Sequence, residues 1–380
     1  MSNVLTGLIP TIYNALDIVS REPIGLLPAV TLDAQFTRAA VGQTVTSPVA
    51  PAAVGENITP GVTPPSSGGQ TIGAISMSIT KARAWPILWQ GEEVLGVNNN
   101  GAKYNTILSY QFQQAFRAAT GEMESDLANL FANASRAFGT AGTTPFASDV
   151  SASANMRKLL MDNGAPLTDL QLIIDTTSGA KLRSLTQLTK VNEAGSADTL
   201  MRGKLIDLSG FAIRESNQIK TPAKGTGSAY TTNTAGYAVG ATSITLITGS
   251  GTVLAGDIVT FAGDTNKYVV ATGVAAPGAI VLANPGLRVA IPTSATALTI
   301  ENVATRNMAF ARTAIALATR APALPEQGDL ATERIMVADP VSGVGFEIAY
   351  YLMYRQIRIE VAAAWGVACV KPEHLALLEG

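Results

Sequence analysis

The chain has 380 residues, a net charge of −2 and a charged fraction of 14%. Ordinary soluble domains carry about 25% charged residues, so this surface is unusually poor in charge. The small net charge argues against a nucleic-acid or membrane-surface binder that relies on a long-range field. A free monomer with so little charge would be poorly soluble, so we expect much of the surface to be buried against other chains. A composition rich in Ala, Gly and Thr is the alternative explanation.

The beginning of the sequence predicts an N-terminal arm, to which we assign residues 1–38. Apolar residues recur at helical spacing within 1–22, and Pro23 and Pro28 then break the pattern. The stretch has no basic leader and no long apolar core, so we do not expect a secretory signal. No stretch reaches the ~18 consecutive apolar residues of a membrane helix, and no membrane partner is expected. The one cysteine, Cys369, excludes an intrachain disulfide, which suits a reducing cytoplasm.

Residues 39–85 have the pattern of a long hairpin. Alternating apolar and polar residues at 41–45 and 75–80 indicate two half-buried strands. Between them, SPVAPAAVGENITPGVTPPSSGGQ (47–70) contains five prolines, four glycines and one charged residue, Glu56. A two-stranded hairpin is marginal in water, so we predict that this one lies on a neighbouring subunit. That subunit would cover the apolar side chains of Val49, Val54, Ile58 and Val62.

Residues 86–147 are assigned to a peripheral domain built on one long spine helix. Apolar residues recur every three or four positions over 103–138, which predicts a helix about 50 Å long. Gly121 costs about 1 kcal/mol in its interior and would permit a bend or a close contact. A coiled coil does not fit, because the phase of the pattern drifts. Trp85 and Trp89 before the helix are candidate anchors between subunits, with packing in the local core as the alternative.

Two pairs of acidic residues are further candidates for contacts between subunits. Glu92 and Glu93 follow the hairpin, and as neighbours in a strand they would point apart. Glu122 and Asp126 share one face of the predicted helix, where like charges repel mildly. We therefore expect a positively charged neighbour for this second pair, either in this subunit or in another. A general acid and base would need two carboxylates in one cleft, which the sequence does not indicate.

The rest of the chain alternates helix and strand patterns around an insert. We assign 148–221 and 304–380 to the two parts of an axial α/β domain, the second of which returns to the peripheral domain. Residues 222–303 nearly lack charges and show short strands at regular spacing, which predicts an inserted all-β barrel or sandwich. Its strands are expected at 243–248, 257–261, 267–272, 280–282 and 298–300. Outside the insert, helices are expected at 155–161 and 178–191, and strands at 170–175, 210–216, 346–353 and 356–361.

The sequence contains none of the common catalytic motifs. There is no Walker pattern, no G-x-S-x-G nucleophile elbow and no G-x-G-x-x-G loop. A zinc site at His374 and Cys369 would need carboxylates for most of its ligands, so we interpret them as a surface histidine and a small buried cysteine. Basic residues form pairs at most, which argues against tight sequence-specific DNA binding but not against enclosing DNA. We expect no enzymatic activity, no cofactor and no metal.

Short segments spread along the whole chain together resemble a known family. In chain order they are NVLTGLIPTIYNALDIVSRE, ITPGVTPP, WQGEEV, SRAFGTAGTTPF, LLMDNGAP, GFAIRES and WGVACVKPEH. Their order and spacing resemble major capsid proteins of tailed bacteriophages with the Hong Kong 97-type fold. The coat proteins of short-tailed Salmonella phages, which carry an inserted β-barrel, are the most similar group. The resemblance implies an α+β fold with an N-terminal arm, an extended hairpin (E-loop), a spine helix and an axial domain.

The resemblance also implies a function and a set of partners. Copies of the chain would form hexamers and pentamers that close an icosahedral shell around double-stranded DNA in the virion. Assembly in the bacterial cytoplasm would involve a scaffolding protein and a portal at one vertex, followed by expansion of the procapsid, with a decoration protein as an optional partner. An encapsulin-like nanocompartment, with a cargo enzyme and no DNA, is the alternative with the same fold. A secreted adhesin or surface-layer protein and a hydrolase fit the sequence less well.

Overall fold

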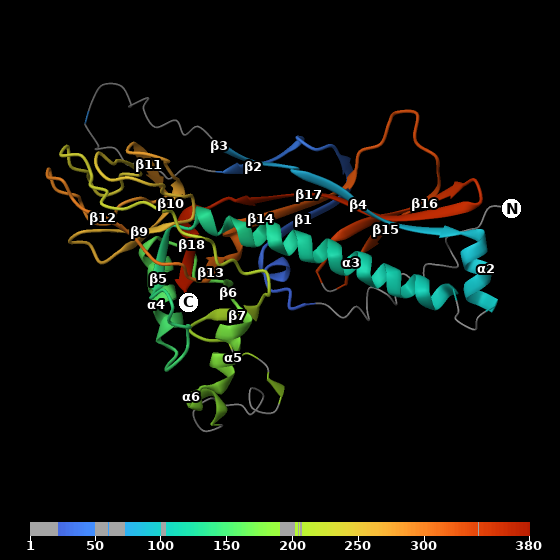
Figure 1. Ribbon diagram of the computed structural model, residues 1–380, viewed down its shortest axis with the longest axis horizontal. Helices are drawn as coiled ribbons and strands as arrows, with labels where there is room; N and C mark the ends of the chain where they lie inside the picture. Colours follow the sequence, from blue (N-terminus) through green and yellow to red (C-terminus); the bar gives the residue numbers. More distant parts are fainter. Residues whose placement is uncertain are drawn as a thin grey trace.

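The computed structural model describes residues 22–49, 60, 73–99, 104–190, 202, 203, 205, 207–340 and 342–380. These residues form two large mixed sheets, one long helix and a separate two-stranded hairpin (Figure 1). The predicted α+β composition is therefore confirmed. The predicted helix within 1–22 and the side chains of Val54, Ile58 and Val62 lie outside the described residues.

The first sheet has six strands in the order β1-β14-β17-β16-β15, with β4 paired to β17. β4 pairs along one edge of β17, while β16 and β14 follow one another along its other edge. β17 runs well beyond the predicted 356–361, because β4 pairs with it as far as Trp365 and β14 pairs with it from Ala364 to Cys369. The strands are β1 Thr31–Ala39, β4 Lys81–Gln90, β14 Ile315–Pro322, β15 Ala331–Ala338, β16 Gly345–Met353 and β17 Gln356–Cys369.

One face of this sheet is covered by the long helix α3 Tyr104–Ala128 (Figure 1). Its 25 residues span about 37 Å. The ring of Phe116 meets the ring of Phe346 in β16 edge-on, with 5.3 Å between the centroids. The other buried apolar residues of the helix recur every three or four positions and join the largest core of the subunit. They are Leu108, Phe112, Ala115, Ala119, Met123, Leu127 and Ala128.

The predicted extent of this helix, 103–138, is wrong at its C-terminal end. After Ala128 the chain forms a 3₁₀ turn and then enters a strand. Both the backbone N–H and the Oγ–H of Ser135 donate to the carbonyl of Leu375, at 2.8 and 2.7 Å. Strand pairing therefore overrides the helical spacing of the apolar residues that follow. The two elements are η3 Asn129–Asn133 and β5 Arg136–Gly139.

The second sheet has ten strands, and its main path runs β12-β9-β10-β5-β18-β13-β6-β7. The predicted axial domain supplies β6, β7 and β13, and the chain end supplies β18. The predicted helix 178–191 is broken in two, because Leu185 adopts an extended conformation. The elements are α4 Ser151–Asp162, β6 Leu170–Ile174, α5 Thr176–Ser184, α6 Thr186–Thr189, β7 Phe211–Glu215, β13 Arg306–Ala311 and β18 Leu375–Glu379. Short 3₁₀ turns, η2 Leu27–Ala29, η4 Arg312–Ala314 and η5 Pro372–His374, precede β1, β14 and β18.

The predicted insert, 222–303, supplies the outer strands of the second sheet. Each strand predicted there has a counterpart, and β10 pairs with β5 through Tyr268 and Arg136. This pairing makes the insert continuous with the body. The insert also has a hydrophobic core of its own, made only of side chains between Tyr230 and Ile300. Its strands are β8 Ser243–Thr245, β9 Ile258–Phe261, β10 Lys267–Thr272, β11 Ala279–Leu282 and β12 Leu298–Ile300.

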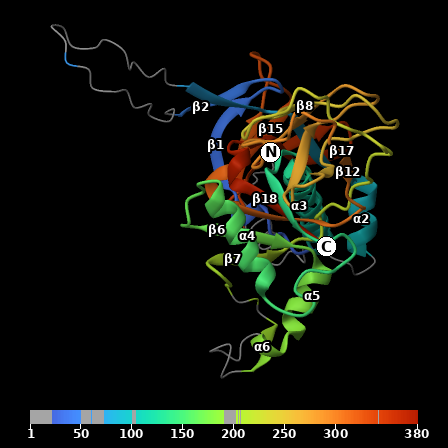
Figure 2. The same cartoon turned by 90° about the vertical axis from the view of Figure 1, so that its left-hand side faces the viewer.

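The predicted hairpin has a two-stranded stem, β2 Thr44–Val49 and β3 Gly73–Ser78. The strands pair from Thr44↔Ser78 to Val49↔Gly73, and Figure 2 shows β2 projecting from the body. The elements on either side of the stem belong to the first sheet. β1, which begins in the assigned arm 1–38 and ends at Ala39, pairs with β14, and the last residues of the assigned hairpin 39–85 belong to β4.

The insert provides a test of the domain boundary. Residues 222–303 expressed alone are expected to unfold cooperatively and to give a β-type circular dichroism spectrum, because their core is made within the segment. We expect a lower thermal midpoint than in the full chain, since excision exposes the edge of β10 that pairs with β5. A spectrum of a disordered chain would contradict the boundary.

Candidate functional site

The base of the hairpin is held against β17 by a close crossing. Ile79 is buried between Ala39, Ala318 and Ala364. Its backbone also pairs with the other side of the hairpin: Gly42 N–H donates to its carbonyl, and its own N–H donates to the carbonyl of Gln43, both at 2.9 Å.

The crossing itself depends on Gly366 in β17. A Cβ at this position would lie 2.0 Å from the carbonyl oxygen of Ser78, which is far inside van der Waals contact. Thr80, two residues further on, donates its backbone N–H to the carbonyl of Trp365 at 3.0 Å. The direction in which the hairpin leaves the subunit is therefore fixed by a glycine and by backbone pairing.

Beyond this base the stem has little cover. Among the described residues, the elements in closest contact with β2 and β3 are each other and β17. Met77 is buried at the base, Val45 and Ile75 are half-buried, and Thr44, Thr46 and Ala74 are exposed. Val49, one of the predicted contact residues, pairs with Gly73 at the end of the stem. The hairpin therefore presents pairing edges and apolar side chains that the described part of the subunit does not cover.

The two predicted tryptophan anchors differ in burial. Trp89 is 8% exposed, donates its Nε1–H to Gln111 Oε1 at 2.7 Å and meets Tyr104 edge-on at 5.0 Å. Its contacts therefore place it in the local core, which was the alternative to an anchor between subunits. Trp85 stacks on Trp365, with 6.2 Å between the ring centroids, and is half-buried. The Trp85 side chain also lines a surface groove between β4 and α3.

The acidic pair on α3 has the positively charged neighbours that we expected, and they lie in the same chain. Lys81 Nζ lies 3.2 Å from Glu122 Oε1 and 2.8 Å from Asp126 Oδ1. Arg83 adds a contact of 2.8 Å to Glu122 Oε1. Burial acts to lower the pKa of Lys81, but its hydrogen bonds to both carboxylates outweigh this effect and raise the pKa. These ion pairs fasten the start of β4 to the long helix.

The prediction that the second acidic pair lies in a strand is wrong. Glu92 and Glu93 do not lie in a strand, because they begin the helix α2 Gly91–Asn99. Glu93 Oε2 accepts the backbone N–H of Gln90 at 2.9 Å, which satisfies a free donor at the helix start. Both side chains are exposed. Negative charge near a helix N-terminus is favourable, so these residues have a local role in addition to any contact with another chain.

A buried carboxylate that was not among the predicted contact residues holds residues 25–27 to α3. Glu124 is fully buried, and its oxygens accept the backbone N–H groups of Gly25, Leu26 and Leu27 at 2.7, 2.8 and 2.9 Å. Burial raises the pKa of Glu124, and the hydrogen bonds act in the opposite direction. One feature of the sequence could have identified Glu124. It lies four residues after Thr120, at a position of the helical pattern that faces the core.

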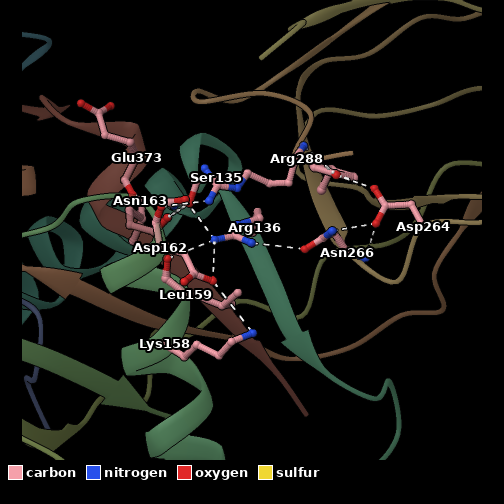
Figure 3. A network of polar contacts seen from close by, with 12 residues as sticks. Ser135, Arg136, Lys158, Leu159, Asp162, Asn163, Asp264, Asn266, Arg288 and Glu373 are labelled. Atoms are coloured by element: carbon pink, nitrogen blue, oxygen red, sulfur yellow. Dashed lines mark hydrogen bonds and ion pairs between the residues drawn. The ribbon is translucent and has the colours of Figure 1, made fainter. Parts of the chain in front are cut away.

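A buried arginine organises the junction between the insert and the body (Figure 3). Arg136 in β5 donates to the carbonyl of Leu159 at 3.2 Å and to Asn163 Oδ1 at 3.0 Å in the body, and to Asn266 Oδ1 at 3.2 Å in the insert. Arg288 of the insert donates to the carbonyl of Asp162 at 3.1 Å. Burial, together with the nearby Arg288, lowers the pKa of the Arg136 guanidinium. The insert is thus fixed to the body by polar contacts as well as by strand pairing.

The two residues considered for a metal site have ordinary surroundings. Burial raises the pKa of Cys369 to about 12 and lowers that of His374. Within the described ranges, no cluster of three or more His, Cys, Asp or Glu side chains is arranged to hold a metal ion. None of the helices in the described part of the chain is long and apolar enough to cross a membrane.

No protein-family model and no curated protein matches the sequence. Among solved structures, "Capsid structure of the Cyanophage P-SCSP1u" aligns with a TM-score of 0.50 at 12% identity, over 94% of this chain and 88% of that chain. This chain has the fold of a phage capsid subunit. A structure from Mycobacterium phage Che8 gives a TM-score of 0.46 at 13% identity, covering 89% and 84% of the two chains. A virus-like particle from Pyrococcus furiosus gives 0.45 at 10% identity, covering 98% of each chain.

The capsid fold assigns a place to the elements described above. The predicted α+β fold of the Hong Kong 97 type, with one long helix beside a sheet, is confirmed by the alignment with the cyanophage capsid. The long helix of that fold corresponds to α3. Of the predicted contact residues, the structure brings Glu122 and Asp126 together at the start of β4 through Lys81. Trp85, in the middle of β4, stacks on Trp365, whose Nε1–H donates to Asp126 Oδ2 at 2.9 Å. Glu92 and Glu93 lie beyond the other end of β4.

The buried carboxylate can be tested by an isosteric change. Glu124→Gln replaces a carboxylate oxygen with an NH₂ group that faces backbone donors. We expect a loss of about 2 kcal/mol in the free energy of unfolding, measured by urea denaturation of dilute subunits. Glu122→Gln is the matched control on the same helix and should change the midpoint little, because its partners reach into solvent. Equal effects of the two substitutions would contradict the role given to Glu124.

Proposed function

We propose that this chain is the major capsid protein of a tailed bacteriophage. In this proposal, copies form the hexamers and pentamers of an icosahedral shell that encloses double-stranded DNA. The fold shared with the cyanophage capsid supports it. So does the low charged fraction, 14%, which suits a surface that is largely buried against other copies. The role is structural, and it needs neither a catalytic site nor a cofactor.

The observation that carries the proposal is the uncovered hairpin. In the part of the chain that the structure describes, Ile79 and the crossing at Gly366 fix the stem at its base, and the stem then projects from the body (Figure 2). The sequence between its strands is apolar, proline-rich and nearly uncharged. A neighbouring subunit would cover Val49, Val54, Ile58 and Val62, and identical contacts repeated by rotation would close a shell. The proposal has five further contact residues. They are Trp85, the exposed pair Glu92 and Glu93, and the acidic pair Glu122 and Asp126.

We propose further that the insert is a closed β-barrel, as in the coat proteins of short-tailed Salmonella phages. The sheet path gives neighbouring strands in the order β12-β9-β10-β11-β8. Thr232 bridges to Leu246, just after β8, while Thr231 bridges to Ala297, just before β12. A segment around these two threonines would therefore complete the ring. The separate core inside it supports the same interpretation.

The proposal includes partners that act at defined stages. A scaffolding protein would guide assembly in the bacterial cytoplasm, a portal would occupy one vertex, and the shell would expand as it matures, with a decoration protein as an optional addition. DNA would be enclosed without sequence-specific contacts. An encapsulin-like compartment would instead hold a cargo protein, and the long hairpin and the insert argue against it. Nucleic acid in purified particles would distinguish the two functions.

Deletion of residues 47–70 tests this function. Negative-stain electron microscopy of the recombinant full chain, with and without a scaffolding protein, is expected to show closed shells. The deletion variant should give soluble subunits or capsomers that do not close, because the contact that links neighbouring copies is missing. The matched control keeps the length of the loop and combines Val54→Ser, Ile58→Ser and Val62→Ser. It should also reduce the fraction of closed shells. Normal shells from the deletion variant would refute the role of the hairpin.

A further inference from the structure

A groove of about 740 Å³ lies between the helix α2 and the turn that joins β16 to β17, at one end of the first sheet (Figure 1). Two apolar side chains that line it are open to solvent in the described part of the chain: Leu352 is 48% exposed and Met353 is 52% exposed. Leu352 lies six positions after Phe346 in β16, so both face the side of the sheet that α3 covers. None of the nine residues of α2 is buried among the described residues. Because a helix this short depends on tertiary packing, a further segment over the groove would complete it.

The wall of the groove beside α2 is fixed by backbone contacts. The N–H of Gly91 donates to the carbonyl of Arg355 at 3.2 Å, which joins the start of α2 to the β16–β17 turn. Arg355 has a φ of 56°, and its guanidinium lies 5.7 Å from the centroid of the Tyr354 ring. A non-glycine residue in the left-handed region is held there by its surroundings. The groove is therefore formed before any segment enters it.

The chain that precedes β1 leads toward this groove. The N–H of Leu27 donates to Glu124 near the C-terminal end of α3, whereas the side chain of Glu22 pairs with Arg117, two turns nearer the start of the helix. Followed backward from Leu27 to Glu22, the chain thus runs toward the N-terminal end of α3. That end of the helix contacts Trp89, which lines the groove.

The residues before Glu22 have the length and the apolar pattern to fill the groove. Residues 1–21 contain only two charged side chains, Asp17 and Arg21. As a helix, 5–19 would span about 22 Å, and the thirteen steps of α3 from Arg117 back to Tyr104 cover about 20 Å. The beginning of the segment can therefore reach the groove. Its apolar residues at helical spacing are Leu5, Leu8, Ile9, Ile12, Ala15, Leu16 and Val19.

We propose that residues 1–21 dock in this groove of their own subunit, with the apolar face of a helix against Leu352 and Met353. The inference goes beyond the proposed function, because it concerns a contact within one chain. Methionine and leucine side chains suit an amphipathic helix in a groove, since methionine adapts to irregular apolar partners. The ion pair at Glu22 leaves a tether of only a few residues. Such a tether gives an effective concentration on the order of millimolar, which favours the subunit's own segment over that of a second copy.

Disulfide trapping within one chain tests the assignment. Full-length chains with Cys369→Ala and Met353→Cys carry one further substitution each, Leu5→Cys, Leu8→Cys or Ile12→Cys. After oxidation of dilute subunits, we expect an intrachain disulfide in at least one of the three, because docking brings the two thiols within bonding distance. The disulfide is measured as the loss of two hydrogens from the intact mass of the monomer.

The matched control moves the second cysteine out of the groove. Met161→Cys on α4 replaces Met353→Cys, since the two methionines are 51% and 52% exposed. Combined with the same three positions of the segment, it should give no intrachain disulfide. Equal yields from Met161→Cys and Met353→Cys, or no disulfide with Met353→Cys at any of the three positions, would overturn the groove as the docking site. A disulfide that forms only between two chains would overturn docking within one subunit.

Two substitutions in the segment give a second readout. In a helix, Ile12 lies on the apolar face and Ile18 lies away from it. In the chain with Leu8→Cys and Met353→Cys, Ile12→Ser is expected to slow disulfide formation about fivefold or more, because it lowers the docked fraction. Ile18→Ser is the same chemical change and should leave the rate unchanged. Equal rates in the two variants would contradict docking by the apolar face.

Discussion

Within the described residues, the contacts that join the hairpin stem to the rest of the subunit lie at its base. At the base, Ser78 crosses β17 over Gly366, and Ile79 is buried, so the direction of the stem is set by backbone contacts. Past this point the pairing of two strands is the main interaction that remains, and two strands alone are marginal in water. In the proposed function, a surface of another chain supplies what the stem lacks. The same burial would account for a chain that is 47% hydrophobic and only 14% charged.

The body that carries the hairpin is made rigid by buried polar groups as well as by its core. Glu124 accepts three backbone N–H groups of the segment before β1, which ties this segment to the C-terminal part of α3. Arg306 and Glu379, both buried, are 3.0 Å apart and connect β13 with the end of β18. Arg136 connects the insert to the body through hydrogen bonds to Asn266 and Asn163. Removing one partner from such a buried pair is costly, so these contacts favour one relative arrangement of the elements.

Some of these features could be predicted from the sequence and others could not, and the reasons are physical. Period-two alternation located the strands of the stem, and regular spacing located β10 and β12 with their observed bounds. The end of α3 was missed because Phe131 and Phe138 keep a helical spacing by coincidence, while the pairing of β5 with β18 decides the conformation. Tertiary pairing of this kind is not encoded in local periodicity.

The candidate site was predictable in composition but not in contacts. Proline content and missing charge identified the hairpin tip, and helical spacing placed Glu122 beside Asp126. The partners of these two residues, Lys81 and Arg83, come from about forty positions away and could not be inferred from local spacing. Trp89 and Trp85 looked equivalent in the sequence, yet only Trp85 lines the groove between β4 and α3. Both rings lie on the same face of β4, and they differ because Trp89 is covered by Tyr104 and Gln111 whereas Trp85 stacks on Trp365.

Hydrogen–deuterium exchange of the full chain, compared between dilute subunits and assembled particles, tests the central claim most directly. If a second copy completes the hairpin, the amides of β2, β3 and residues 50–72 exchange quickly in dilute subunits and become strongly protected in particles. The core strands β17 and β18 serve as the internal reference and should be protected in both states. Full protection of the hairpin in a dilute monomer, or no gain of protection in particles, would contradict the account.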